Sequence, residues 1–215
     1  MEADRGKPPL GVYLITPDWL DTERLREVVA AALRGGAGAV QYRNKVAPPA
    51  LRRDQARVLA RLVQSAHVPF LVDNDAQLAL AVGADGLHIG RDDGDPAEVR
   101  ATLPPAMILG VSCYADLQRV AFALRAGASY VALGAMAPSR TKVGAAIAPI
   151  ERVSEARDMG AHVVASGGVD YANVARIAAA GARAVGVVSA VFGADEPQEA
   201  TAELVAHFAM GVRGR

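Results

Sequence analysis

This chain of 215 residues has one cysteine, few aromatic residues and no net charge. The single cysteine, Cys113, excludes an internal disulfide and fits a reducing compartment. Basic and acidic residues both number 23, so no whole-molecule field draws the protein to nucleic acid or to a membrane surface. No apolar run approaches the ~20 residues of a membrane span, and the polar start of the chain does not resemble a secretory signal. We therefore expect a cytoplasmic protein with no nucleic-acid or membrane partner.

Apolar residues make up 52% of the chain, and many fall in short continuous runs that alternate with helix-like stretches. Such runs are typical of parallel strands that are covered on both faces. We expect strands at 11–16, from 39 through Gln41, and at 68–73, 86–90, 107–112, 130–134, 162–168 and 184–189. We expect helices at 22–33, with Asp21 or Thr22 as N-cap, and at 50–65, 76–82, 96–103, 116–125, 150–159, 172–180 and 197–210.

A Gly-Ala pair precedes five of the expected strands, with its glycine at Gly36, Gly83, Gly127, Gly160 and Gly181. Each glycine lies where a helix should end in the left-handed conformation, which glycine adopts without steric cost. This repetition indicates stacked βα units. The pattern predicts an α/β protein with one domain, a (β/α)8 TIM barrel over 1–215, in which 1–9 is a flexible N-terminal segment. An open doubly wound sheet is the alternative, although no glycine-rich dinucleotide fingerprint follows the first strand.

The end of the second expected strand carries Gln41, Arg43 and Lys45 at a spacing of two. Side chains with this spacing point to the same side of a strand, so an amide and two cations face a common space. That combination suits a diphosphate ester. In isolation the motif is more often a solvated strand end, but in a barrel the carboxyl ends of the strands carry the chemistry.

Two carboxylates follow neighbouring strands of the expected barrel. Asp75 follows the third strand and Asp93 follows the fourth, so their side chains can converge on Mg2+, which prefers oxygen ligands. The alternative is that Asp75 is a helix N-cap and Asp93 is a turn residue. No cluster of His and Cys has the spacing of a zinc site.

Later strand ends offer groups that suit phosphate. The loop at 139–142 carries hydroxyls and Lys142, and it is either a phosphate cradle or a generic polar loop. Gly167–Gly168 and Val188–Ser189 follow the last two strands, where many barrels hold a phosphate on backbone N–H groups. His88 ends an apolar strand and points either into the barrel mouth or toward the outer helices.

With these residues in place, the chain resembles the thiamine-phosphate synthase (thiamine phosphate pyrophosphorylase) family along nearly its whole length. The matching motifs, in family order, are Tyr13-Leu-Ile-Thr16, Gln41-x-Arg-x-Lys45, Asn74-Asp75, Gly83-Ala-Asp-Gly-Leu-His88-x-Gly90-x-x-Asp93, Gly110-Val-Ser112, Gly134 through Thr141-Lys142, Gly167-Gly168-Val169 and Val188-Ser189-Ala190. The resemblance implies a (β/α)8 barrel and a transferase of thiamine biosynthesis. Its reaction joins 4-amino-2-methyl-5-(diphosphooxymethyl)pyrimidine to a thiazole phosphate, with Mg2+ and release of pyrophosphate, by a dissociative substitution at the pyrimidine CH2.

The resemblance also implies roles for individual residues. Arg43, Lys45, Ser112 and Lys142 would be catalytic, and Asp75 and Asp93 would bind Mg2+. The implied substrate-binding residues are Tyr13, Gln41, Tyr42, Arg43, Asn44, Lys45, Asn74, His88, Ser112, Ser139, Thr141, Lys142, Gly167, Gly168, Val188 and Ser189. The implied ligands are small molecules, and the sequence leaves open whether the chain forms a homo-oligomer.

Three positions depart from the family pattern. Asn44 stands where Glu is usual, which removes a charge beside the cations. Residues 135–137 replace Pro-aliphatic-Phe, and 139–141 replace Thr-x-Thr and add Arg140. A related thiazole tautomerase is one alternative function, but it uses a histidine in the strand-six loop, and 134–136 holds none. A non-catalytic barrel that binds a thiamine precursor is another, but it would be expected to lose the metal carboxylates or Lys142.

Overall fold

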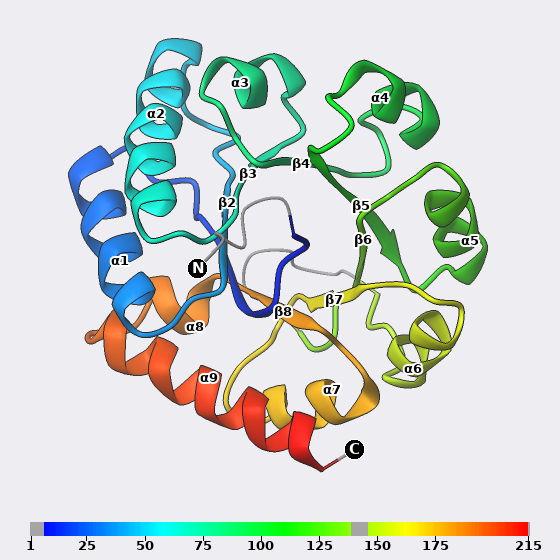
Figure 1. Cartoon of the computed structure of the whole chain (residues 1–215). Coiled ribbons are helices and arrows are strands. Elements are labelled where there is room, and N and C mark those ends of the chain that lie inside the picture. Colours follow the sequence, from blue (N-terminus) through cyan, green and yellow to red (C-terminus); the bar gives the residue numbers. More distant parts are fainter. Residues whose placement is uncertain (1–6, 139–145, 215) are drawn as a thin grey trace.

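A computed structural model describes residues 7–138 and 146–214. Its strands are all parallel and close into a barrel in chain order, with β8 paired to β1 (Figure 1). The strands are β1 (Gly11–Ile15), β2 (Ala39–Tyr42), β3 (Phe70–Asp73), β4 (Gly86–Ile89), β5 (Ile108–Tyr114), β6 (Tyr130–Leu133), β7 (Val163–Ser166) and β8 (Ala184–Val187). The expected (β/α)8 barrel is confirmed, and the open sheet is excluded.

Helices form a ring around this barrel (Figure 1). They are α1 (Thr22–Arg34), α2 (Pro49–Ser65), α3 (Ala76–Ala81), α4 (Pro96–Thr102), α5 (Leu117–Arg125), α6 (Glu151–Asp158), α7 (Val174–Ala180), α8 (Ser189–Phe192) and α9 (Pro197–Arg213). The sequence did not predict α8, because its four residues continue the apolar run of β8. Within the described ranges, no helix combines the length and the apolar character that a membrane crossing requires.

Local sequence explains where these elements begin and end. Asp21 caps α1 as expected, since its side chain accepts a hydrogen bond from the N–H of Arg24. The glycines of the five Gly-Ala pairs all have positive φ, between +64° at Gly83 and +119° at Gly181. The recurring helix-stop pattern was therefore interpreted correctly.

Two hydrophobic clusters fill the molecule. The larger cluster lies between the strands and the helices, and α9 packs against α1 and α7. The smaller cluster comprises Tyr13, Ala39, Leu71, Ile108, Tyr130, Val164 and Ala184, all of them almost fully buried. These side chains fill the inside of the barrel, so the barrel has a packed interior below its mouth.

The start of the chain is partly tied down. Of the segment expected to be flexible, 1–6 lie outside the described residues, whereas Pro9 is buried. The carbonyl oxygen of Pro9 lies 2.7 Å from Nε2 of His162, which immediately precedes β7.

Candidate active site

A cavity of about 700 Å³ opens at the carboxyl ends of the barrel strands. Its volume lies in the range of sites that enclose small organic ligands. Most of the residues that the sequence singled out line this cavity: Tyr13, Gln41, Arg43, Lys45, His88, Asp93, Ser112, Gly167, Gly168, Val188 and Ser189. They come from six of the eight strands or the loops after them, so closure of the barrel creates the site.

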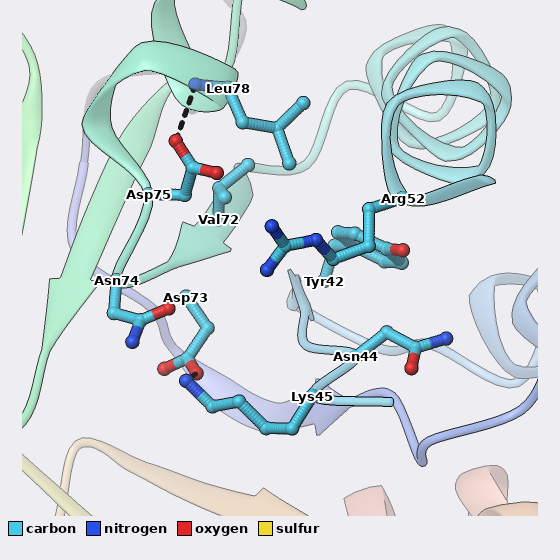
Figure 2. Close-up of a pocket in the computed structure, with 9 residues that line it drawn as sticks. All are labelled: Tyr42, Asn44, Lys45, Arg52, Val72, Asp73, Asn74, Asp75 and Leu78. Carbon is cyan, nitrogen blue, oxygen red and sulfur yellow. Dashed lines mark hydrogen bonds and ion pairs between the residues drawn. The ribbon is translucent and has the colours of Figure 1, made fainter. Parts of the chain in front are cut away.

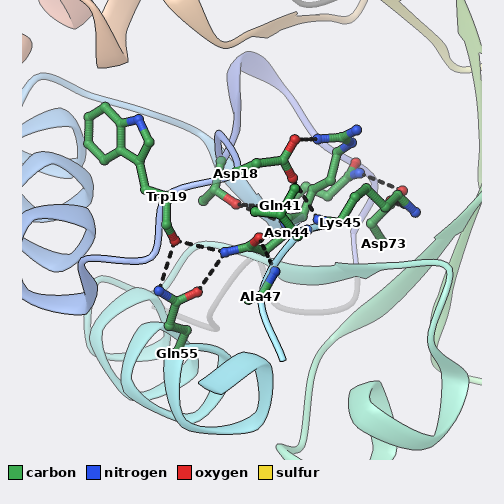
Figure 3. A network of polar contacts seen from close by, with 11 residues as sticks. Asp18, Trp19, Gln41, Asn44, Lys45, Ala47, Gln55 and Asp73 are labelled. Carbon is green, nitrogen blue, oxygen red and sulfur yellow. Dashed lines mark hydrogen bonds and ion pairs between the residues drawn. The ribbon is translucent and has the colours of Figure 1, made fainter. Parts of the chain in front are cut away.

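The end of β2 presents Gln41, Arg43 and Lys45 to the cavity, as their spacing predicts. The loop after β1 holds this end in place. Thr16 Oγ1 accepts a hydrogen bond from the N–H of Arg43 and donates one to its carbonyl oxygen, both at 2.8 Å. Asp18 Oδ2 lies 2.8 Å from Nη1 of Arg43, and Oδ1 accepts a hydrogen bond of 2.6 Å from the N–H of Lys45 (Figure 3). Asp18, which sequence reasoning missed, therefore holds both cationic residues.

Tyr42 and Asn44 alternate with those three residues and do not line the large cavity. The hydroxyl of Tyr42 donates to Oε1 of Gln55 on α2 at 2.9 Å. Nδ2 of Asn44 donates to the carbonyl oxygen of Trp19 at 2.8 Å and to Oε1 of Gln55 at 3.0 Å (Figure 3). Its Oδ1 accepts hydrogen bonds from the N–H groups of Val46 and Ala47. Both side chains thus contact the scaffold, and both also line a small pocket beside the cavity that contains Lys45 and Asp75.

Asp73, at the end of β3, is a second residue that the sequence did not single out. Its Oδ2 lies 2.7 Å from Nζ of Lys45, and its Oδ1 accepts a hydrogen bond of 3.1 Å from Nε2 of Gln41. Asp73 lines the cavity and pairs in register with His88 on β4. Alternation along β3 was the available signal, because Leu71 and Asp73 share the face that points into the barrel.

Asp75 occupies a different space from Asp93. Oδ1 of Asp75 accepts a hydrogen bond of 2.8 Å from the N–H of Leu78 and so caps α3. The residue lines a small neighbouring pocket of about 10 Å³, the size of a single water site, together with Asn74 and Arg52. Figure 2 shows the Arg52 guanidinium pointing into the space between Asp75 and Lys45. Nε of Arg52 is buried and has no hydrogen-bond partner among the described residues.

Asp93 is held at the cavity wall by Asn74 and Gly90. Its Oδ1 accepts a hydrogen bond from Nδ2 of Asn74 at 2.9 Å, and its Oδ2 accepts one from the N–H of Gly90 at 2.7 Å. Burial raises the pKa of Asp93, but these hydrogen bonds and the nearby charge of Lys45 outweigh it and lower the pKa below its usual value. The carboxylate is therefore ionised at neutral pH.

Asp75 and Asp93 are the type of ligand that Mg2+ prefers, but two carboxylates do not complete its coordination. Asp75 and Asp93 offer oxygen ligands, and Mg2+ commonly takes one or two protein carboxylates and leaves its other positions to phosphate and water. Across 7–138 and 146–214, no group of three or more His, Cys, Asp or Glu side chains is gathered to hold a metal. A site here would thus depend on oxygen atoms from a bound diphosphate.

Three side chains that line the cavity, Tyr13, His88 and Ser112, are linked by hydrogen bonds that pass through the fully buried Tyr130. The hydroxyls of Tyr13 and Tyr130 lie 3.0 Å apart, and the Tyr130 hydroxyl lies 2.8 Å from Nδ1 of His88. Nε2 of His88 lies 2.9 Å from Oγ of Ser112. His88 therefore points into the barrel and not toward the outer helices. Tyr130, which sequence reasoning missed, joins β1 to β4.

Gly167, Gly168, Val188 and Ser189 line the cavity at the ends of β7 and β8. Gly168 has a φ of +70°, and an added Cβ there would collide with the carbonyl oxygen of Ala137. Only glycine lets the backbone pack this close to the segment after β6. Of the loop expected to complete a phosphate site, Ser139, Thr141 and Lys142 lie outside the described residues.

Comparison with known proteins gives one consistent result. A family model described as thiamine monophosphate synthase matches residues 12–191. The thiamine-phosphate synthase of Bordetella pertussis is 47% identical over 209 residues, covering 94% of this chain and 96% of the relative. That of Chromobacterium violaceum is 46% identical over 198 residues, covering 92% and 96%. The solved structure of a thiamine phosphate pyrophosphorylase from Pyrococcus furiosus superposes with a TM-score of 0.84 at 31% identity, covering 94% of this chain and 97% of that one.

Proposed function

The chain belongs to the thiamine monophosphate synthase family, and from this premise we propose that it is a thiamine-phosphate synthase. It joins the CH2 group of 4-amino-2-methyl-5-(diphosphooxymethyl)pyrimidine to the ring nitrogen of a thiazole phosphate. The C–O bond to the diphosphate breaks, the new C–N bond forms, and pyrophosphate leaves. The observation that carries this proposal is the cationic end of β2, which faces the same cavity as Asp93, His88 and Ser112.

Arg43 and Lys45 at the end of β2, which we call the cationic wall, bind the diphosphate. Asp18 pairs with the Arg43 guanidinium and Asp73 pairs with the Lys45 ammonium, so both charges are aimed before the substrate arrives. Negative charge grows on the departing pyrophosphate, and preorganised cations stabilise that charge more in the transition state than in the ground state. Lys142 adds a further cation from the loop after β6.

Asp93 at the cavity wall and Asp75 in the small neighbouring pocket would hold Mg2+, the metal that their carboxylate oxygens suit. When bound, it neutralises charge on the leaving group. Asn74 supports this arrangement, because its Nδ2 donates to Oδ1 of Asp93 and orients the carboxylate.

The remaining walls hold the two rings. Tyr13, Gln41, His88 and Ser112, which line the cavity from β1, β2, β4 and β5, receive the pyrimidine. Gly167, Gly168, Val188 and Ser189, with Ser139 and Thr141, bind the thiazole phosphate. The thiazole nitrogen is the nucleophile, so the protein needs no strong base. Its contribution is to align the two reactants and to stabilise charge.

The test is to incubate purified protein with both substrates, with and without Mg2+, and to measure thiamine phosphate and pyrophosphate separately. We expect the two products in equal amounts, only when Mg2+ and both substrates are present. A reaction without thiazole phosphate controls for simple hydrolysis of the diphosphate. Absence of Mg2+-dependent thiamine phosphate from folded protein would refute the proposal.

A further inference from the structure

One unbroken series of hydrogen bonds crosses the barrel interior, and we call it the interior chain. It starts at the cationic wall and ends at Ser112. Its members in order are Lys45, Asp73, Gln41, Tyr13, Tyr130, His88 and Ser112, with successive contacts of 2.7, 3.1, 2.8, 3.0, 2.8 and 2.9 Å. These residues come from β1 to β6 and from the loop after β2.

The carboxylate of Asp73 sets the direction of the first bonds. A carboxylate only accepts hydrogen bonds, so the Gln41 atom facing it must be Nε2, and Oε1 must face Tyr13. The amide oxygen can only accept, so the single hydroxyl proton of Tyr13 goes to Gln41. Burial raises the pKa of both phenols, Tyr13 and Tyr130, so each keeps its one proton at neutral pH.

The donor and acceptor roles of Tyr130, His88 and Ser112 follow from the role of Tyr13. Because the proton of Tyr13 is already engaged, Tyr130 must donate to the Tyr13 oxygen. Its own oxygen then accepts from Nδ1–H of His88. If the imidazole is neutral, Nε2 of His88 then carries a lone pair, which accepts the hydroxyl proton of Ser112.

Gly110 is what lets Tyr130 reach His88. In the sheet His88, Gly110 and Tyr130 lie side by side on β4, β5 and β6. A Cβ at Gly110 would collide with the Tyr130 ring, and the open space allows that ring to stack on His88 at 5.6 Å with an interplanar angle of 23°. The Tyr130 side chain is fully buried, so water does not compete for its hydroxyl.

We propose that Tyr130 is a positioning residue that holds His88 in the neutral Nδ1–H tautomer and thereby makes Ser112 a hydrogen-bond acceptor toward the cavity. With its proton turned to His88, Oγ of Ser112 offers only lone pairs to a ligand. It therefore selects a ring whose facing substituent is a donor, such as an amino group, over one with a carbonyl oxygen. This consequence for the substrate rests on the proposed function, whereas the tautomer of His88 does not.

The tautomer is tested directly by 15N NMR of the imidazole rings in the ligand-free protein at neutral pH, with His88→Gln used to assign the His88 signals. We expect a protonated Nδ1 and an unprotonated Nε2. In Tyr130→Phe the acceptor for Nδ1–H is gone, so the proton should move to Nε2 and the Ser112 hydroxyl should turn outward. Tyr171→Phe, which removes a tyrosine hydroxyl that donates to the carbonyl oxygen of Ala200, should leave the His88 signals unchanged. A wild-type His88 that is protonated at Nε2 would overturn the proposal.

The selectivity is tested by calorimetric titration with the 4-amino pyrimidine diphosphate and with its 4-oxo analogue, in Mg2+ and without thiazole phosphate. We expect wild type and Tyr171→Phe to bind the amino compound on the order of 10²-fold more tightly than the oxo analogue. Tyr130→Phe should lower this ratio of affinities by about tenfold or more, because one mispaired buried polar group costs this much. An unchanged ratio in Tyr130→Phe, with the His88 proton moved, would refute the selective role. If wild type binds the amino compound selectively but makes no thiamine phosphate, the proposed function fails and the role of Tyr130 stands.

Discussion

Replacing Asn44 with alanine separates a scaffold role from a substrate-binding role. Asn44 is only 4% exposed, donates to Trp19 and Gln55, and accepts from the N–H groups of Val46 and Ala47. Two of these partners keep other contacts in the variant, since Nε2 of Gln55 still donates to the Trp19 carbonyl oxygen. The greatest loss is at Ala47, which is 7% exposed and would keep a buried, unpaired N–H.

The expected cost is large for a single side chain. A net hydrogen bond contributes about 1 kcal/mol, and an unsatisfied buried N–H costs about 1–3 kcal/mol. We therefore expect Asn44→Ala to lower the free energy of unfolding by roughly 2–4 kcal/mol, a large share of the 5–15 kcal/mol typical of a domain. Gln55→Ala should couple to it in a double-mutant cycle by about 0.5–3 kcal/mol, because the two side chains share a hydrogen bond.

The assay is urea unfolding followed by circular dichroism, with calorimetric titration of the pyrimidine diphosphate on the same samples. The matched control is Gln198→Ala, which removes an exposed side chain that accepts one hydrogen bond from Arg34. We expect that change to stay within about 0.5 kcal/mol of wild type. The reasoning would be refuted if Asn44→Ala kept wild-type stability and yet lost pyrimidine diphosphate binding, since Asn44 would then face the ligand.

Two further predictions concern buried titratable groups. Cys113 is fully buried, and burial raises the pKa of its thiol to about 12. A thiol reagent at pH 8 should therefore label Cys113 only as fast as the protein unfolds. Rapid labelling of the native protein would contradict this prediction. His162 has its pKa lowered by burial, with a smaller contribution from the charge of Arg183 and partial compensation by the Pro9 carbonyl. The unfolded chain then binds the proton more readily, so stability should fall as pH drops below the ordinary value of about 6.5 toward the lowered pKa. His162→Gln should reduce that slope in urea unfolding series at several pH values, and equal slopes would refute the assignment.

Sequence reasoning predicted the barrel because its signals are local. Each strand is a short apolar run, and glycines such as Gly83 and Gly181 end helices through a backbone conformation that their lack of a side chain permits. The common direction of Gln41, Arg43 and Lys45 also follows from local geometry, since side chains two apart in a strand share a face. The same rule already implied that Tyr42 and Asn44 point the other way.

Two of the missed residues, Tyr130 and Asp18, depend on contacts between distant parts of the chain. Tyr13 and Tyr130 are 117 positions apart and meet only because the barrel closes with a particular register. Asp18 lies in a loop whose path is set by its contacts with Arg43 and Lys45, and no periodic pattern marks it. Asp75 had two competing interpretations, and the structure shows it capping α3 while its role toward a metal stays a prediction.

The most direct test of the account is the rate of thiamine phosphate formation by Lys45→Ala, measured at saturating Mg2+ and compared with wild type and with Arg61→Ala. Lys45 lines the cavity and pairs with Asp73, whereas Arg61 is an exposed cation in the nearby helix α2. We expect Lys45→Ala to lose on the order of 10²-fold or more in turnover while circular dichroism shows a folded protein, because one preorganised charge contact to the leaving group is lost. Arg61→Ala should keep wild-type turnover. A folded Lys45→Ala with wild-type turnover would contradict the assignment of the β2 end to the diphosphate.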